Sequence, residues 1–151
     1  DYYQRTGNRQ RVRQVAADYD ELSRNFQFVE AERGMADIDD QFRAHELAAE
    51  DLESLLNYLR GKEVVKQLYV VKKVCRHYPE WPHYYLLVRI KFPVLSLETD
   101  QAKAQLNQEI LNAASFDGSL LLHNIDHAPH VCAKKIAAMP SALVYQREGY
   151  R

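Results

Sequence analysis

The fold is decided by residues 68–92, which read LYVVKKVC, RHYPEWPH and YYLLVRIKF in three successive segments. Because alternate residues of a strand share a face, the third segment places five apolar side chains together: Tyr84, Leu86, Val88, Ile90 and Phe92. Its opposite face begins with Tyr85 and Leu87 and turns polar at Arg89. The first segment is apolar on both faces before Lys72, which is typical of a strand inside a sheet. We therefore predict a β-hairpin with an eight-residue connector, residues 76–83.

The overall composition is that of an ordinary globular protein. The chain has 151 residues, of which 46% are hydrophobic and 27% are charged, so it is long enough to bury one core. A net charge of −1 argues against a nucleic-acid binder, because such proteins usually carry a clear basic excess. No apolar run approaches the ~20 residues that span a bilayer. Two cysteines, Cys75 and Cys132, do not make a disulfide framework, so we expect free thiols and a cytoplasmic location.

The N-terminal segment leaves two interpretations open. The chain starts at Asp1 rather than Met, and two tyrosines are followed by four arginines: Arg5, Arg9, Arg11 and Arg13. Tyrosine at the interface and arginine on the inner side are typical of the cytoplasmic exit of a membrane helix. One hypothesis is therefore a cytoplasmic domain tethered by a membrane segment that precedes Asp1. The alternative is a frayed, soluble terminus.

Residues 9–61 have the spacing of amphipathic helices. Steps of three and four place seven residues on one face of the first helix: Val12, Val15, Ala16, Tyr19, Leu22, Phe26 and Val29. We expect Gly34 to end this helix as a left-handed C′ cap. A second stripe runs to Gly61 through Met35, Ile38, Phe42, Ala48, Ala49, Leu52, Leu55, Leu56 and Leu59. We predict an antiparallel helical hairpin. A bent continuous helix, or self-association into a dimer through helices 9–59, are the alternatives.

Charge is divided between two neighbouring regions. Acidic residues gather in the predicted second helix, at Asp37, Asp39, Asp40, Glu46, Glu50, Asp51 and Glu53. Basic residues gather in and around the hairpin, at Lys62, Lys66, Lys72, Lys73, Arg76, Arg89 and Lys91. Opposite patches of this kind attract, either within one chain or between two.

The rest of the chain completes an α+β fold. After the hairpin we predict a helix over about residues 100–117, a strand at 119–125, a short helix near 130–138 and a strand at 141–146. The predicted class is α+β, with an N-terminal helical hairpin or long helices followed by a ββαβαβ domain with a four-stranded mixed sheet. The helical region 1–61 and the sheet domain 62–151 are expected to form one compact unit.

Four motifs in residues 51–147 carry a resemblance to a known family. They are LESLLNYL at 52–59, VKQLYVV at 65–71, a Pro-x-x-x-Leu-Leu-Val-x-Ile strand from Pro82 to Ile90, and ALVYQR at 142–147. Their order and approximate spacing resemble the C-terminal domain of the SseB family, the enhanced-serine-sensitivity proteins. The resemblance implies a small accessory or regulatory domain that acts by binding. It brings no catalytic residues and no cofactor.

A cluster of potential metal ligands lies near the C-terminus. His123, Asp126, His127 and His130 lie within eight residues, close to Cys132, and imidazole, carboxylate and thiolate are zinc ligands. The spacing matches no standard zinc finger. The alternatives are therefore a metal-binding protein and a plain strand-to-helix turn with solvated histidines and a core cysteine.

The connector is the stronger binding candidate. Arg76, Tyr78, Trp81 and His83 combine aromatic rings with basic groups, as interface anchors do, and two prolines should keep the loop stiff. The alternative is that these rings fold back onto the end of the sheet. Because the sequence contains no glycine-rich phosphate loop and no nucleophile elbow, we predict a non-enzymatic interaction or regulatory domain without a cofactor. Its expected partner is a protein rather than a nucleic acid.

Overall fold

The computed structural model describes residues 9–93 and 100–150, and the side chains of residues 9–12, 15, 18, 19 and 22 also lie outside this description. Within these ranges the chain forms four helices and a five-stranded sheet. In order they are α2 (Arg9–Arg33), β1 (Phe42–Ala44), α3 (Ala49–Arg60), β2 (Val65–Lys73), β3 (His83–Ile90), α4 (Asp100–Ala113), β4 (Ser119–Asn124), α5 (His130–Ala137) and β5 (Leu143–Gln146). The predicted α+β class is confirmed.

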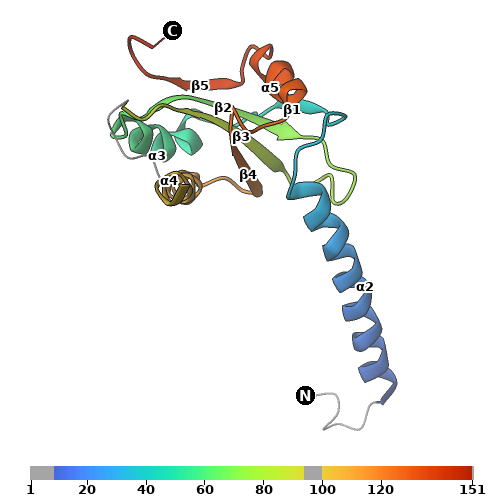
Figure 1. Cartoon of the computed structure of the whole chain (residues 1–151). Helices are drawn as coiled ribbons and strands as arrows, with labels where there is room; N and C mark the ends of the chain where they lie inside the picture. The colour runs from blue at the N-terminus through green and yellow to red at the C-terminus, as the bar shows by residue number, and fades with distance from the viewer. Residues whose placement is uncertain (1–8, 94–99, 151) are drawn as a thin grey trace.

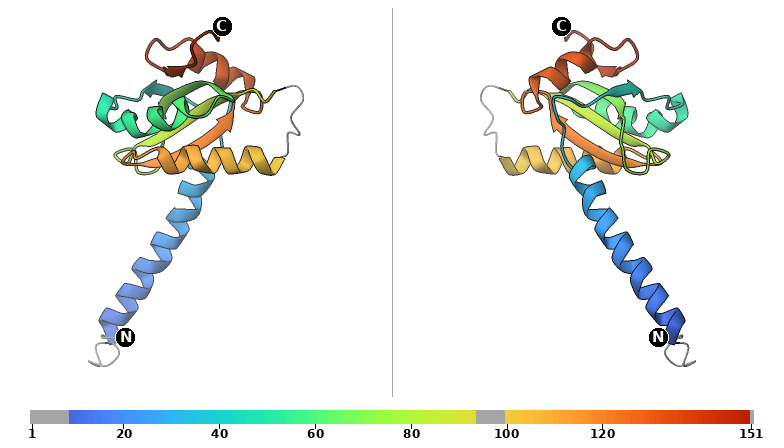
Figure 2. Two further views of the ribbon diagram at one scale, coloured as in Figure 1. Left: turned by 90° about the vertical axis from the view of Figure 1, so that its left-hand side faces the viewer. Right: turned by 90° about the vertical axis from the view of Figure 1, so that its right-hand side faces the viewer.

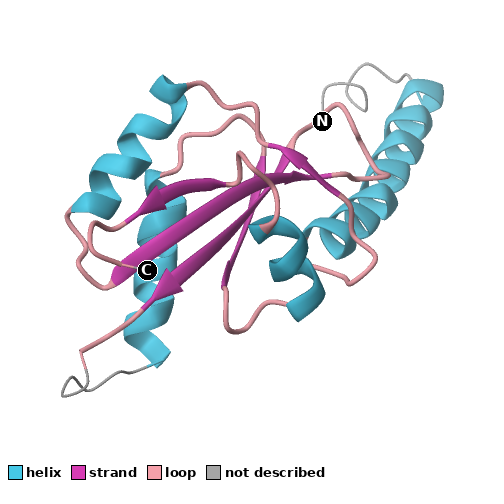
Figure 3. Ribbon diagram, turned by 90° about the horizontal axis from the view of Figure 1, so that it is seen from above, coloured by secondary structure: helices cyan, strands magenta, loops and turns pink. Residues whose placement is uncertain are grey.

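Strand β2 lies at the centre of a mixed sheet (Figure 3). On one side it pairs antiparallel with β3, so that Val71 lies opposite Tyr85. Its other edge is shared by β1 and β5, which pair with opposite halves of β2. Strand β4 runs parallel to β3 on the far side. The two strands of the predicted hairpin are therefore neighbours in the sheet, joined by residues 74–82.

The sheet is covered on both faces, as Figure 1 shows. Tyr84, Leu86 and Val88 point to the face covered by α3 and α4, where Leu55 and Ile110 are fully buried. Tyr85 and Leu87 point to the other face, where they pack with α5 and its neighbouring segments. The alternation along β3 thus assigns successive side chains to two different cores.

The segment between α2 and α3 corrects the prediction of a second helix from residue 35. Helix α3 begins only at Ala49, and residues 42–44 form strand β1 instead. Phe42 pairs with Lys73 at the sheet edge, and its ring stacks on Tyr85 with centroids 5.8 Å apart. These long-range contacts outweigh the local preference for helix. The N-terminal helical hairpin therefore does not form, and the sheet gains a strand beyond the predicted four.

Gly34 ends α2, but not as the left-handed cap that we expected. Among the described glycines, a positive φ occurs at Gly118 and Gly149 but not at Gly34. Instead its N–H donates to the carbonyl of Glu30 at 2.8 Å, and a Cβ at this position would lie 2.7 Å from the same oxygen. Glycine is needed here for the close approach of the backbone.

Helix α2 projects from the rest of the molecule (Figures 1 and 2). Its 25 residues make a rod about 37 Å long. Only its C-terminal end reaches the sheet domain, where Val29 is buried. No helix in the described ranges is both long enough and apolar enough to cross a bilayer. Half of the predicted membrane-exit pattern, Tyr2, Tyr3 and Arg5, falls on residues 1–8, which lie outside the described residues.

Candidate functional site

The base of α2 is held by one buried arginine. Arg33, the last residue of the helix, is 5% exposed. Its Nη1 donates to Ser119 Oγ at 2.7 Å, at the start of β4. Its guanidinium also lies 4.8 Å from the ring centroid of Trp81. The remaining bonds go to connector carbonyls, namely those of His77 (3.2 Å), Tyr78 (3.0 Å), Trp81 (2.8 Å) and Pro82 (3.3 Å). We call this arrangement the joint.

Two more charged residues fix the same end of α2. The Glu32 carboxylate accepts the N–H groups of Arg76 at 2.7 Å and His77 at 3.1 Å. Burial alone would raise the pKa of Glu32, but these two N–H groups and nearby positive charge hold it below its usual value. On β2, Lys73 donates to the carbonyls of Glu32 and Met35 and pairs with Asp40 at 3.2 Å. The joint therefore fixes where α2 leaves the domain.

Three of the four residues predicted to contact a partner lie on the surface beside the joint. Trp81 is 47% exposed and Tyr78 is 41% exposed, and Arg76 is also exposed. Tyr78 has a φ of 52°, a left-handed conformation that costs a non-glycine residue energy. The carbonyls on either side of the turn are held by Arg33, so the connector presents its rings in one conformation.

His83 is corrected from a contact residue to a core residue. It is 1% exposed, and its Nδ1 lies 2.7 Å from Ser119 Oγ. Burial, followed by the positive charges of Arg33 and Lys73, lowers its pKa to about 4, so the ring is neutral. The sequence held a signal for this, since His83 is in phase with Tyr85 and Leu87 on an inward face of β3.

Large apolar side chains are exposed around the joint. Phe26 is 57% exposed and Phe28 is 60% exposed on α2, and Met35 just beyond it is 60% exposed. Phe28 stacks on His77 with ring centroids 5.8 Å apart. The sequence prediction missed Phe28 because it lies off the apolar stripe. Single exposed apolar residues are common, but three large ones near the C-terminal end of one helix are typical of a contact surface.

A hollow of about 590 Å³ lies at the foot of α2, and we call it the base groove. The lining residues that matter here are Glu32, Met35, Asp37, Asp39, Val74 and His77. Met35 and Val74 give it apolar walls. Its charged lining consists of four acidic residues, Glu32, Asp37, Asp39 and Asp40, and two basic ones, Lys73 and Arg76, and Lys73 is already paired with Asp40. Such a groove suits a segment that carries both apolar and basic side chains.

The charge complementarity predicted from the sequence is formed partly within the chain. Lys73 pairs with Asp40, and Lys72 pairs with Glu46 at 3.2 Å. Lys135 of α5 donates to the carbonyls of Ile38 and Asp40. These bonds hold the segment before α3 against the sheet.

The four predicted metal ligands are not brought together. His123 Nδ1 lies 2.8 Å from the hydroxyl of Tyr85, and Asp126 pairs with Arg89 at 3.7 Å. Both His127 and His130 are exposed. Across residues 9–93 and 100–150, no group of three or more potential metal ligands is close enough to hold an ion.

The two cysteines are free and buried. Burial raises the pKa of both thiols, which makes them poor nucleophiles. Cys132 Sγ lies 3.0 Å from the carbonyl of Asp37 and so packs α5 against the segment before β1.

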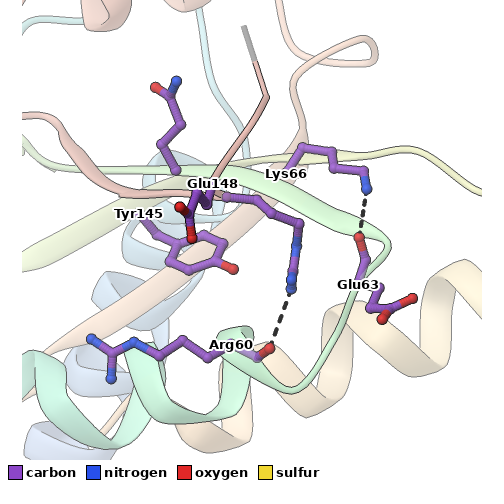
Figure 4. Close-up of a pocket in the computed structure, with 7 residues that line it drawn as sticks. Arg60, Glu63, Lys66, Tyr145 and Glu148 are labelled. Atoms are coloured by element: carbon purple, nitrogen blue, oxygen red, sulfur yellow. Dashed lines mark hydrogen bonds between the residues drawn. The ribbon is translucent and has the colours of Figure 1, made fainter.

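A second hollow, of about 510 Å³, lies between α3 and β5 (Figure 4). Its basic groups already have partners. Arg147 donates to the carbonyls of Leu59, Arg60, Lys62 and Val65, at the C-terminal end of α3 and the start of β2. Lys66 donates to the carbonyl of Glu63, and Arg60 to Asn57 Oδ1. This arrangement closes the C-terminal end of α3 and offers little to a ligand.

Comparison with known proteins adds no relative: no family model, curated protein or solved structure matches the chain.

Proposed function

We propose that the chain is a non-enzymatic interaction module, with α2 as the arm that contacts another protein chain. The observation that carries the proposal is the contrast between the two ends of this helix. Its base is fixed by Arg33, Glu32 and Lys73, while its length stands clear of the domain with Phe26 and Phe28 exposed. A helix that is held at its base and projects from its own domain is suited to contact another chain.

The joint lowers the cost of binding at this surface. Ordering flexible side chains and loops on association costs free energy, and preorganised groups avoid part of that cost. Arg33 already holds the connector carbonyls, so Trp81 and Tyr78 are presented without further ordering. Tryptophan, tyrosine and arginine are the usual anchors of protein interfaces. Trp81, Tyr78 and Arg76 therefore form the second part of the proposed contact surface.

The cellular setting belongs to the same proposal. In this proposal the sheet domain is cytoplasmic and is tethered to a membrane through a segment that precedes Asp1. Helix α2 would then connect the tether to the domain. The resemblance of residues 51–147 to the SseB C-terminal domain agrees with a role in binding, and it stays a prediction.

Photo-crosslinking in cells that produce the full chain tests the proposal without knowledge of the partner. A benzoylphenylalanine at Phe28 replaces an exposed ring, and the matched control carries it at Glu53 on the exposed side of α3. We expect a discrete protein adduct from position 28 and none from position 53, with the position-28 adduct reduced by Trp81→Ala. Equal labelling from both positions, or none from either, would contradict the proposal.

A further inference from the structure

We infer that the free edge of strand β4 is a docking site for an extended segment of a partner protein, which adds one strand to the five of the sheet. The inference gives the proposed interaction module a second contact surface, and its tests use no residue of α2. Three features carry it: the unpaired backbone groups of β4, its half-buried leucines, and the contrast with the opposite edge of the sheet.

One side of β4 carries backbone groups without hydrogen-bond partners. The strand is the last of the sheet, beyond β3 (Figure 1). The N–H of Ser119 donates to the carbonyl of Pro82 at 3.0 Å, and the N–H of Ile125 donates to β3 at 2.9 Å, so alternate residues between them bond to β3. The residues in between turn both of their backbone groups the other way. Leu120 and Leu122 therefore each present an N–H and a C=O outward, and no described residue bonds to these groups.

Asn124 completes this free edge. Its N–H points outward in the same phase, whereas its carbonyl already accepts the N–H groups of His127 at 2.9 Å and Ala128 at 3.1 Å. Donors and acceptors at every second residue, over the five residues from Leu120 to Asn124, are the pattern that an adjacent strand matches. The edge therefore fits about five residues of extended chain.

The leucines of β4 are half-buried because the strand has a neighbour on one side. On β3, which lies between β2 and β4, Leu86 and Leu87 are fully buried. On β4, Leu120 and Leu122 pack against the core beneath α3 and α4, and Leu121 packs against the core beneath α5, yet all three stay partly exposed. A strand beside β4 extends both cores and buries these leucines. The docking segment is therefore expected to carry apolar side chains on both of its faces.

The opposite edge of the sheet is protected in ways that β4 is not. Strand β1 has three residues, with Arg43 exposed, and β5 has four residues and pairs with β2 through a shift of register. Short strands, charges and bulges discourage pairing with another chain. Strand β4 has six residues in unbroken register with β3 and contains no lysine, arginine or proline. Burial lowers the pKa of its one histidine, His123, so the strand carries no charge at pH 7.

The free edge begins at the contact surface already proposed. Ser119, the first residue of β4, accepts a hydrogen bond from Arg33 in the joint and donates to the carbonyl of Pro82, at the end of the connector. The preceding residue, Trp81, is 47% exposed. An extended segment that leaves β4 at this end meets the connector, so one partner reaches both. This continuity assigns the docking segment to the protein that contacts Trp81 rather than to a second copy of the chain.

Amide hydrogen exchange of the purified chain, followed by nuclear magnetic resonance, tests whether the edge is open. The N–H groups of Leu121 and His123 bond to β3, so those of Leu120 and Leu122 should exchange at least about a hundredfold faster. Equal protection of the four amides would overturn the inference, because the edge would then already be covered. Protection of Leu120 and Leu122 that grows with protein concentration would also overturn it, because the occupant would be a second copy.

Peptide binding tests the occupant. The probe is a phage-displayed library of random twelve-residue peptides, selected on the purified chain, and one selected peptide is synthesised with N-methyl groups on either of its two alternating sets of amides. We expect the peptide to slow exchange at Leu120, Leu122 and Asn124. Methylation of the set that faces β4 should weaken binding at least about tenfold, whereas methylation of the other set should leave it within about threefold. If no selected peptide protects these amides, or if both methylated forms bind equally well, the inference fails.

A matched pair of variants tests the edge from the side of the chain. Leu122→Pro removes an outward N–H that β3 does not use, and should weaken peptide binding at least about tenfold. Leu122→Ala loses the same side chain but keeps the N–H, and should bind within about threefold of the unaltered chain. Equal binding by the two variants would contradict the inference. If circular dichroism shows that Leu122→Pro has lost its fold, the two methylated peptides decide the question without it.

The outcome is separate from that of crosslinking through α2. If position 28 captures a protein while no peptide protects the amides of β4, only this inference fails. If a peptide docks on β4 while position 28 captures nothing, the role of α2 in the proposed function fails and the docking edge stands.

Discussion

Helices α2 and α3 both carry an apolar stripe, but only the stripe of α3 is covered by the sheet domain along its length. In α3 the stripe is covered, and Leu55 and Leu59 are fully buried. Its ends follow the helix dipole, with Glu50 and Asp51 in the first turn and Arg60 in the last. In α2 the helix leaves the domain, its first turn carries no acidic residue, and only Arg33 in its last turn follows the dipole. Apolar spacing thus indicates that a face needs a cover, but it does not say whether the helix's own domain supplies that cover.

The largest expected effect is the difference in unfolding free energy lost when an apolar side chain is truncated in each of the two stripes. Leu55→Ala on α3 removes a fully buried side chain and should lower the free energy of unfolding by about 4 kcal/mol. Phe26→Ala on α2 removes a larger side chain but should change it by less than about 0.5 kcal/mol at concentrations where the chain is monomeric. Urea unfolding measures both. A large loss for Phe26→Ala would show that α2 is covered within its own chain.

The next effect concerns His83, which lies where the two regions meet. Its folded pKa of about 4 lies below the usual 6.5, so the unfolded chain takes up the proton first as the pH falls. The neutral ring therefore contributes its full stability above about pH 6.5, and this contribution, at most on the order of 3 kcal/mol, is lost as the pH falls toward 4.

Comparison with His83→Gln isolates this contribution. Unfolding free energies of both chains, measured between pH 7 and pH 4, should converge as the pH falls, because only the histidine chain loses this term. A constant difference between the two chains would show that His83 is accessible to protons in the folded state.

The smallest of the three stability effects belongs to the joint itself. Arg33→Met keeps much of the side-chain length but leaves several carbonyls without their donor, and should cost about 2 kcal/mol. Arg24→Met, which removes one exposed bond to the carbonyl of Asp20, should cost less than about 0.5 kcal/mol. Similar values for the two variants in urea unfolding would mean that the joint does not fix α2.

The sheet was predictable because its signal is local. The period-two alternation of β3 identifies two faces, and both faces proved to be core. The same alternation would have placed His83 inward, but its polar ring favoured a surface interpretation. Residues 35–48 were mispredicted as helix because what holds them, the stack of Phe42 on Tyr85 and the bonds of Lys73, comes from residues far along the chain.

The joint could not be predicted from the sequence for the same reason. Arg33 looks like an ordinary basic residue in the last turn of a helix. Its hydrogen-bond acceptors lie 44 to 86 residues further along the chain, so no local sequence pattern predicts them. The apolar stripe of α2 can be read from the sequence. The direction in which α2 leaves the domain cannot, because it depends on the long-range contacts of the joint.

Hydrogen exchange of the purified chain tests most directly whether its own domain leaves α2 uncovered. The amides of residues 16–28 should exchange through local opening of the helix, and faster than the amides of α3, which the sheet domain covers. Protection of residues 16–28 equal to that of α3 would contradict the account.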